Sequence, residues 1–169
     1  MQIDALIPVI IGLHNSGVHI TVETCLFIPV KNLQAALEIV DLFYVDVKIL
    51  DAERCNALEK GNLECYLSNL DTLFAWRDQQ GRKKPVIIRI PVIGSYTDTP
   101  DNRNAGKMLL KKYENSILKI ELIKEHNLGE SKYRSLGMQT DYHGVADGLM
   151  ELYKLELETV GVPTEICCV

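Results

Sequence analysis

The stretch Val40–Asp51, which reads VDLFYVDVKILD, decides how the rest of the chain is interpreted. It is apolar and rich in β-branched and aromatic residues, a composition typical of a strand buried on both faces in a parallel sheet. Asp46 and Lys48 interrupt it near its carboxyl end, and because they are two residues apart they lie on one face of the strand. Ligands of parallel α/β folds bind beyond the carboxyl ends of the strands. A functional site is therefore expected at this edge of the predicted sheet.

The sequence on either side alternates predicted strands with predicted helices. Strands are predicted at Val18–Thr24, Leu42–Lys48, Val86–Ile90 and Ile117–Ile123, with a weak final strand at Val162–Cys167. Helices are predicted at Ile3–Asn15, Lys31–Ile39, Asp51–Lys60, Leu63–Gln80, Asp101–Tyr113, Ser131–Leu136 and His143–Thr159. Start signals precede or open four of them: Pro29 for Lys31–Ile39, Asp51 for Asp51–Lys60, Asn62 for Leu63–Gln80 and Thr99-Pro100 for Asp101–Tyr113. This alternation implies right-handed crossovers and an α/β fold with a parallel sheet of about four strands plus the weak C-terminal one.

Length and composition restrict the function classes. With 169 residues, of which 47% are hydrophobic, the chain is expected to form one domain, residues 1–169, with a real core. The net charge of −5 and the single short basic run at 82–84 exclude an electrostatic nucleic-acid surface. No apolar stretch approaches the roughly 18 residues that span a membrane, and the start lacks the basic region of a signal peptide.

The cysteines indicate a reducing compartment. There are five of them, at positions 25, 55, 65, 167 and 168, an odd number in no metal-ligand spacing. Reduced thiols in a cytoplasmic protein are the default interpretation. Cys25 directly follows a predicted strand and could line the site, although a small buried thiol is the favoured interpretation.

Polar residues follow or end four successive predicted strands. They are Glu23 and Thr24, then Asp46 with Lys48, then Arg89, and finally His126 in the loop after the fourth strand. In a barrel-like sheet these side chains converge on one mouth. The mixture of acids, fixed cations and an imidazole suits a ligand that carries both a carboxylate and a positive charge, because Arg can bind a carboxylate bidentately and the acids can hold a cation or an ammonium group.

Each of these residues also has a structural interpretation. Asp46 and Lys48 could form an ion pair at the rim of the sheet, and Arg89 could pair with Asp46 or Glu23. Glu23 and Thr24 could make ordinary strand-end hydrogen bonds, and His126 could be a surface histidine. The joint pattern favours a site more strongly than any single residue does.

Several segments resemble the radical SAM glycyl-radical-enzyme activating enzymes, the pyruvate formate-lyase activating enzyme family. The matching segments are GVHITVETC at 17–25, VDLFYVDVK at 40–48, the Asn69-Leu70 pair in the next long helix, RIPVI at 89–93 and LIKEHNLGESKY at 122–133. They stand in the family's order and cover about residues 6 to 137. Gly94-Ser95 replaces the family's usual Pro-Gly, and Lys124 replaces a usual proline.

The resemblance implies an incomplete (β/α) barrel that uses S-adenosylmethionine and a [4Fe–4S] cluster to release a 5′-deoxyadenosyl radical and make a glycyl radical on a partner such as pyruvate formate-lyase. It also implies an electron donor such as flavodoxin or ferredoxin, and that the cofactors carry the hard chemistry. The residues implied to contact S-adenosylmethionine are Thr24, Asp46, Lys48, Arg89 and His126. Glu23, Thr24 and Asp46 match the place where some members hold a monovalent cation.

The family's cluster motif, Cys-x-x-x-Cys-x-x-Cys, does not occur in the sequence, nor does its Gly-Gly-Glu-Pro strand end. We therefore expect the chain to correspond to the C-terminal part of an activating enzyme, with no catalytic residue and no cluster of its own, and to be inactive alone. We also expect Val18–Thr24 to form an exposed sheet edge that favours pairing with another copy.

Two alternatives remain open at this stage. In the first, the chain is a stand-alone module that binds an adenosyl ligand or a partner without turnover. In the second, which ignores the resemblance, it is a carbon–carbon lyase in which Lys48 forms a Schiff base and Asp46 or Glu23 acts as the acid–base group.

Overall fold

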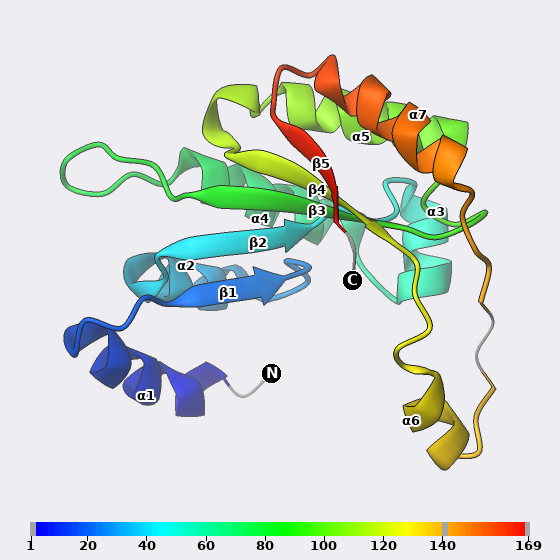
Figure 1. Ribbon diagram of the computed structural model, residues 1–169. Coiled ribbons are helices and arrows are strands. Elements are labelled where there is room, and N and C mark those ends of the chain that lie inside the picture. Colours follow the sequence, from blue (N-terminus) through cyan, green and yellow to red (C-terminus); the bar gives the residue numbers. More distant parts are fainter. Residues whose placement is uncertain (1–2, 140–141, 168–169) are drawn as a thin grey trace.

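The VDLFYVDVKILD stretch forms β2 (Leu42–Asp46), the second strand of a five-stranded parallel sheet in the computed structural model (Figure 1). The structure describes residues 3–139 and 142–167. The other strands are β1 (Thr21–Thr24), β3 (Val86–Val92), β4 (Lys119–Lys124) and β5 (Thr164–Cys167). The strand order is β1-β2-β3-β4-β5, every neighbouring pair is parallel, and the sheet stays open between β1 and β5. The predicted α/β fold with an incomplete parallel barrel is confirmed.

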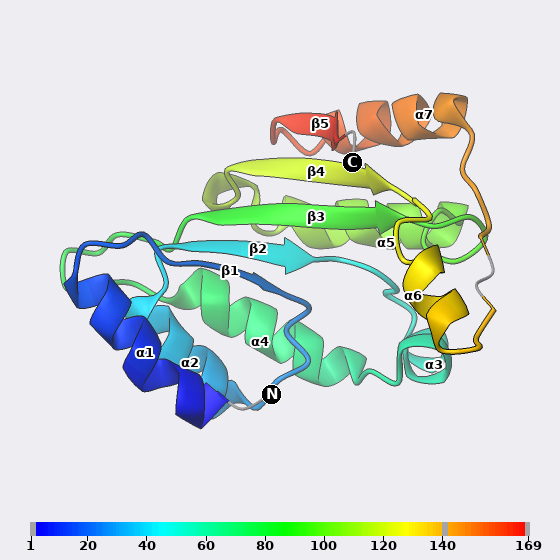
Figure 2. The ribbon, with the colours of Figure 1, turned by 60° about the horizontal axis from the view of Figure 1, so that its bottom comes forward.

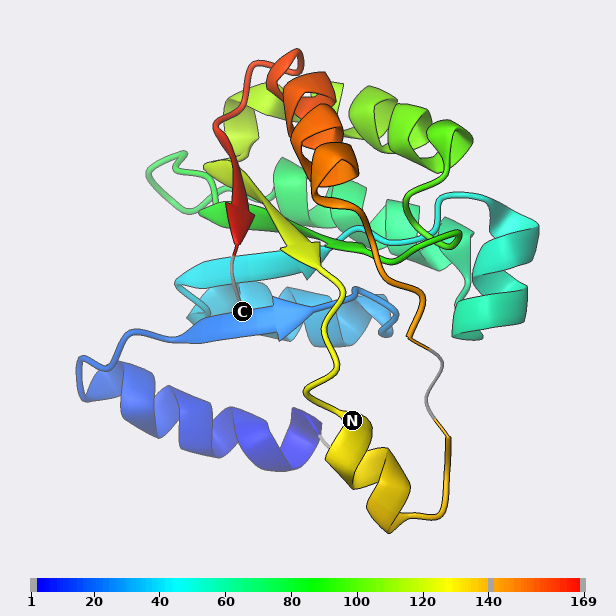
Figure 3. The ribbon, with the colours of Figure 1, turned by 45° about the vertical axis from the view of Figure 1, so that its right-hand side comes forward.

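Helices connect successive strands and cover one face of the sheet (Figure 2). The α-helices are α1 (Ile3–Asn15), α2 (Val30–Ile39), α3 (Ala52–Arg54), α4 (Leu63–Ala75), α5 (Pro100–Lys111), α6 (Glu130–Ser135) and α7 (Asp147–Glu158). A π-helical turn, η1 (Cys55–Glu59), follows α3, and a 3-10 turn, η2 (Glu114–Ser116), precedes β4. Helix α1 lies beside α2. Helix α6 lies away from the sheet, in the segment that connects β4 to α7 (Figures 1 and 3).

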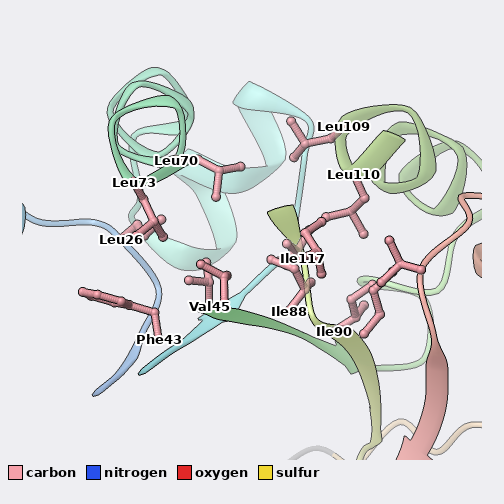
Figure 4. Packing of buried hydrophobic residues seen from close by; sticks show 14 of the residues in the cluster. Leu26, Phe43, Val45, Leu70, Leu73, Ile88, Ile90, Leu109, Leu110 and Ile117 are labelled. Carbon is pink, nitrogen blue, oxygen red and sulfur yellow. The ribbon is translucent and has the colours of Figure 1, made fainter. Parts of the chain in front are cut away.

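The core lies between the sheet and its helices. In β2, Phe43 and Val45 are almost fully buried on the helix side, where Leu70 and Leu73 of α4 pack against them (Figure 4). Alternate residues of the strand, such as Tyr44, face the opposite side and are only half-buried. The prediction that this strand is buried on both faces is therefore wrong for the residues described, since the open sheet has helices on one side only.

Three predicted helix starts are confirmed by side-chain caps. The side chains of Asp51, Asn62 and Thr99 accept hydrogen bonds from backbone N–H groups of the first turns of α3, α4 and α5. These caps satisfy donors that a helix cannot pair internally. Within residues 3–139 and 142–167, no helix combines the length and the apolar character needed to cross a membrane.

Two predicted helices are shorter than expected, and an acidic side chain explains each difference. Helix α4 ends at Ala75 instead of Gln80 because the Asp78 carboxylate accepts the N–H groups of Gln80 and Arg82 and closes a turn there. Helix α7 begins at Asp147 instead of 143 because the Glu125 side chain binds the N–H groups of the preceding loop.

Ser95 adopts a left-handed backbone conformation with φ 64°, at the position of the Pro-Gly glycine. We expect Ser95→Gly to raise the free energy of unfolding by about 0.5 to 1 kcal/mol, because this backbone conformation strains any residue with a Cβ. The greater freedom of glycine in the unfolded chain offsets part of the gain in stability. Urea unfolding measures the change. Ser95→Ala keeps the Cβ and serves as the control, and equal stability of the two variants would contradict the explanation.

Candidate functional site

The carboxyl ends of the parallel strands bring the predicted site residues to one edge of the sheet. Glu23 and Thr24 end β1, and Asp46 ends β2. The register pairs Asp46 with Arg89, so the predicted cation of β3 lies beside the carboxylate of β2. Lys48 was expected within the strand, but β2 ends at Asp46 and Lys48 lies in the loop that follows.

Asp46 and Lys48 contact each other, as the ion-pair interpretation predicted. The distance from Lys48 Nζ to Asp46 Oδ2 is 3.4 Å, and the Asp46 side chain is 17% exposed. Burial raises the pKa of Asp46 above its ordinary value, and the nearby Lys48 ammonium opposes this effect only in part. The Tyr66 hydroxyl donates to the Asp46 carbonyl over 3.1 Å and fixes the backbone beneath the pair.

A cavity of about 10 Å³ adjoins this pair, which is room for about one water molecule. Its walls include Cys25, so the less favoured interpretation of that thiol, as a residue lining the site, is correct in position. They also include Glu59, whose Oε2 atom is buried and has no hydrogen-bond partner among the described residues. Burial raises the pKa of the Glu59 carboxyl. Glu59 was not among the site residues predicted from the sequence.

Arg89 is bound by two acids rather than by Asp46. Its NH1 nitrogen lies 2.8 Å from Glu23 Oε2, and its Nε donates to Glu121 Oε2 over 2.9 Å. The guanidinium carbon also lies 4.1 Å from the centre of the Tyr44 ring, in cation–π contact. Of the two pairings considered from the sequence, the one with Glu23 is confirmed. The second acid, Glu121, was not anticipated.

Glu121 is the buried centre of a charge network across β3, β4 and β5. It is only 5% exposed, and besides Arg89 it pairs with Lys119 Nζ at 2.7 Å, while Lys119 also binds Glu165. Burial alone would raise the pKa of Glu121, but Lys119 and Arg89 outweigh it and hold this pKa below the ordinary value. A residue that interrupts an apolar strand pattern, as Glu121 does, is the signal that could have identified it.

The described residues contain one group of acid and thiol side chains close enough to ligate a metal: Glu121, Glu165 and Cys167, with ligand atoms within 4.8 Å of one another. Lys119 pairs with both carboxylates and Arg89 pairs with Glu121, so these two cations already balance the charge of the two acids. Of the predicted cation ligands, Glu23 is bound by Arg89. The Thr24 hydroxyl accepts the N–H of Leu26 over 3.0 Å, so the strand-end hydrogen bond considered from the sequence is present.

His126 lies in the loop after β4, exposed, and no ion pair or hydrogen bond joins it to the other predicted site residues within the described chain. It lines two cavities of about 320 and 300 Å³, the second shared with Tyr133 and Tyr142. The residues before it anchor this region: Lys124 pairs with Asp147 at 2.5 Å, and Glu125 accepts the N–H of Gly144 over 2.9 Å. Lys124, which stands where the family usually has proline, thus forms an ion pair with Asp147.

Comparisons with known proteins find relatives that are named as activating enzymes, although no protein-family model matches the chain. It is 39% identical over 131 residues to the benzylsuccinate synthase activating enzyme of Thauera aromatica, which covers 77% of the chain and 38% of that relative. It is 26% identical over 168 residues to the 4-hydroxyphenylacetate decarboxylase activating enzyme of Clostridioides difficile, covering 99% of the chain and 51% of that relative. The chain therefore spans about half the length, or less, of these curated relatives.

Solved structures agree on the fold. A domain of a pyruvate-formate lyase-activating enzyme from Bacteroides vulgatus superimposes with a TM-score of 0.77 at 18% identity, covering 99% of this chain and 92% of that one. A radical SAM methyltransferase from Sphaerobacter thermophilus gives a TM-score of 0.56 at 13% identity, covering 90% and 42%. At these identities the likeness shows a shared fold and no more.

Proposed function

We infer from these relatives that the chain belongs to the radical SAM glycyl-radical-enzyme activating enzymes, and we propose that it forms part of the S-adenosylmethionine site of such an enzyme. The observation that carries the proposal is the set of charges at the carboxyl edge of the sheet, where Asp46, Lys48 and Arg89 lie on neighbouring strands or directly after one. When bound, S-adenosylmethionine and the family's cluster supply the radical chemistry.

The donors at this edge fit the methionine part and the ribose of S-adenosylmethionine. The Arg89 guanidinium is a fixed cation that can bind a carboxylate, and it is held in place by Glu23 and Glu121. The Asp46 carboxylate can accept hydrogen bonds from an ammonium group or from ribose hydroxyls, and Lys48 can donate to ribose hydroxyl oxygens or to a carboxylate. Thr24 ends β1 and His126 lies in the loop after β4, and we propose that they complete the contacts.

The four described cysteines do not fit an iron–sulfur cluster. Cys55 is buried and Cys25, Cys65 and Cys167 belong to different elements, and the described residues contain no group of three thiols close enough to ligate iron. We therefore propose that the chain alone does not generate a radical. Anaerobic reconstitution with iron and sulfide checks this, and a bound, reducible [4Fe–4S] centre would refute it.

The relatives are named for activating different enzymes, namely benzylsuccinate synthase, 4-hydroxyphenylacetate decarboxylase and choline trimethylamine-lyase. We accordingly propose a glycyl radical enzyme as the partner, with pyruvate formate-lyase as one candidate and flavodoxin or ferredoxin as the electron donor. The free state of the four described cysteines supports a cytoplasmic location within this proposal. Self-association through the edge strand β1 stays a prediction, to be tested by the oligomeric state in solution.

Titration calorimetry of the chain with S-adenosylmethionine tests the proposed site. We expect saturable binding, weakened about tenfold or more by Lys48→Met, which keeps an apolar stem but removes the charged donor. Lys31→Met, on the exposed side of α2, is the matched control and should bind as the parent chain does. Absence of binding by the parent chain, or equal binding by Lys48→Met, would contradict the assignment.

A further inference from the structure

The side chain of Asn102, in the first turn of α5, is 6% exposed and makes three hydrogen bonds to backbone groups of other segments. Its Oδ1 accepts the N–H of Leu50 over 2.8 Å. Its Nδ2 donates to the carbonyl of Lys48 over 2.8 Å and to that of Thr97 over 3.0 Å. One amide thus joins the loop after β2 to the loop after β3.

This arrangement bears directly on Lys48, because Lys48 lies beyond the last residue of β2. Val47 is still hydrogen-bonded to the sheet, through its N–H and the carbonyl of Arg89 at 2.8 Å. After that, Asn102 binds the backbone on both sides of Ile49, at the Lys48 carbonyl and the Leu50 N–H. Fixing these two groups restricts the backbone that carries the Lys48 side chain toward Asp46.

A second buried asparagine makes similar hydrogen bonds to the loop after a neighbouring strand. Asn69 of α4 is 2% exposed, and its Nδ2 donates to the carbonyls of Leu26 and Ile28 in the loop after β1. In both places a buried asparagine on a crossover helix binds the backbone that follows a strand end with a predicted site residue. Buried amides with two or more partners hold a single conformation, because leaving any partner unpaired is costly.

We propose that Asn102 is a positioning residue of the ligand site, and that its carboxamide sets where the Lys48 ammonium group lies. The inference rests on the proposed function for the meaning of Lys48, but the position of Lys48 can be measured without any ligand. Asn102 itself does not line the cavity beside Asp46 and Lys48 and is not expected to touch the ligand.

The ligand-free experiment compares Asn102→Ala with Leu110→Ala, which removes a fully buried side chain from the same helix, and with Asn104→Ala on its exposed side. In Asn102→Ala the Leu50 amide loses its acceptor, so we expect its hydrogen exchange to accelerate at least about tenfold relative to the other slow amides. A crystal structure of this variant should show Lys48 displaced from Asp46. Unchanged Leu50 exchange, or an unchanged 3.4 Å contact, would overturn the proposal.

A second variant separates the two halves of the amide. Asn102→Asp keeps an acceptor for the Leu50 N–H but removes the donor to the Lys48 carbonyl. We expect Leu50 to stay protected while Lys48 moves, and this variant also keeps the test decisive if Asn102→Ala does not fold. Loss of Leu50 protection together with an undisturbed Lys48 would refute the assigned roles.

Ligand binding supplies the functional readout. We expect Asn102→Ala to bind S-adenosylmethionine about tenfold more weakly, which corresponds to about 1.4 kcal/mol. In a Lys48→Met background the same change should cause no further loss, because the residue acts through Lys48. Additive losses would show a merely structural role and overturn the proposal. If the parent chain binds no S-adenosylmethionine, the proposed function fails, whereas the ligand-free measurements still decide the role of Asn102.

Discussion

Glu121→Gln is expected to lower the free energy of unfolding by about 2 kcal/mol at neutral pH, even though the two side chains have nearly the same shape. Glu121 is buried and accepts from Arg89 at 2.9 Å and from Lys119 at 2.7 Å. Glutamine offers one acceptor in place of two, and its NH₂ group would point at a cation. The loss of charge also leaves Arg89 held by Glu23 alone, on an exposed side.

The pH dependence of this effect has a definite sign. Lys119 and Arg89 hold the folded-state pKa of Glu121 below its ordinary value of 4.5, so the native state binds this proton less tightly than the unfolded state does. The contribution to stability is therefore complete above about pH 4.5 and is lost as the pH falls through the folded-state pKa. Urea unfolding of both proteins between neutral and acid pH should show the difference between them shrinking toward low pH.

Glu165→Gln is the matched control, because Glu165 pairs with the same Lys119 but its side chain is 52% exposed. An exposed pair contributes little, so this variant should lie within about 0.5 kcal/mol of the parent. If Glu121→Gln proved as stable as Glu165→Gln, the network would be a surface feature and Arg89 would not depend on it.

The architecture could be predicted from the sequence because its signals are local. Helix starts are predicted by side chains that can cap a helix, namely those of Asp51, Asn62 and Thr99. Apolar runs such as the one around Val45 indicate strands of a parallel sheet. Some of what failed depended on distant atoms. The start of α7, for example, is decided by Glu125, a side chain 22 residues before Asp147.

The candidate site could be predicted only in part for the same reason. The contact between Asp46 and Lys48 follows from sequence spacing, whereas Glu121 reaches Arg89 across 32 positions of the chain and Asn102 reaches Leu50 across 52. No periodicity encodes such pairs. Glu59 was missed because it lies on a π-helical turn, whose extra residue shifts side chains away from the face that an α-helical pattern predicts.

The second large effect is expected from Asp46→Asn, which should weaken S-adenosylmethionine binding by about 10- to 100-fold without lowering the stability of the fold. The loss of affinity follows if the carboxylate accepts hydrogen bonds from the ligand, because bonds to a charged acceptor are stronger than those to an amide. Asp101→Asn, on the exposed first turn of α5, is the matched control and should leave binding unchanged.

Ionisation of Asp46 should affect the stability of the fold in the opposite direction to ionisation of Glu121. Burial raises the folded-state pKa of Asp46 above 3.8, so the native state binds this proton more tightly than the unfolded state does. Ionising Asp46 as the pH rises through this range therefore costs stability, and at neutral pH the cost is fully present. Asparagine removes it, and the unfolding midpoint in urea should stay equal or rise.

The two measurements together decide between the interpretations of the Asp46–Lys48 pair. If the ion pair only stabilises the fold, Asp46→Asn should lower the stability and leave ligand binding unchanged. A ligand site predicts equal or higher stability and weakened binding, because a charge kept where it costs stability is retained for what it binds. The raised pKa of Asp46 favours the second outcome, as does the neighbouring buried Glu59 oxygen, which has no hydrogen-bond partner in the part of the chain that the structure describes.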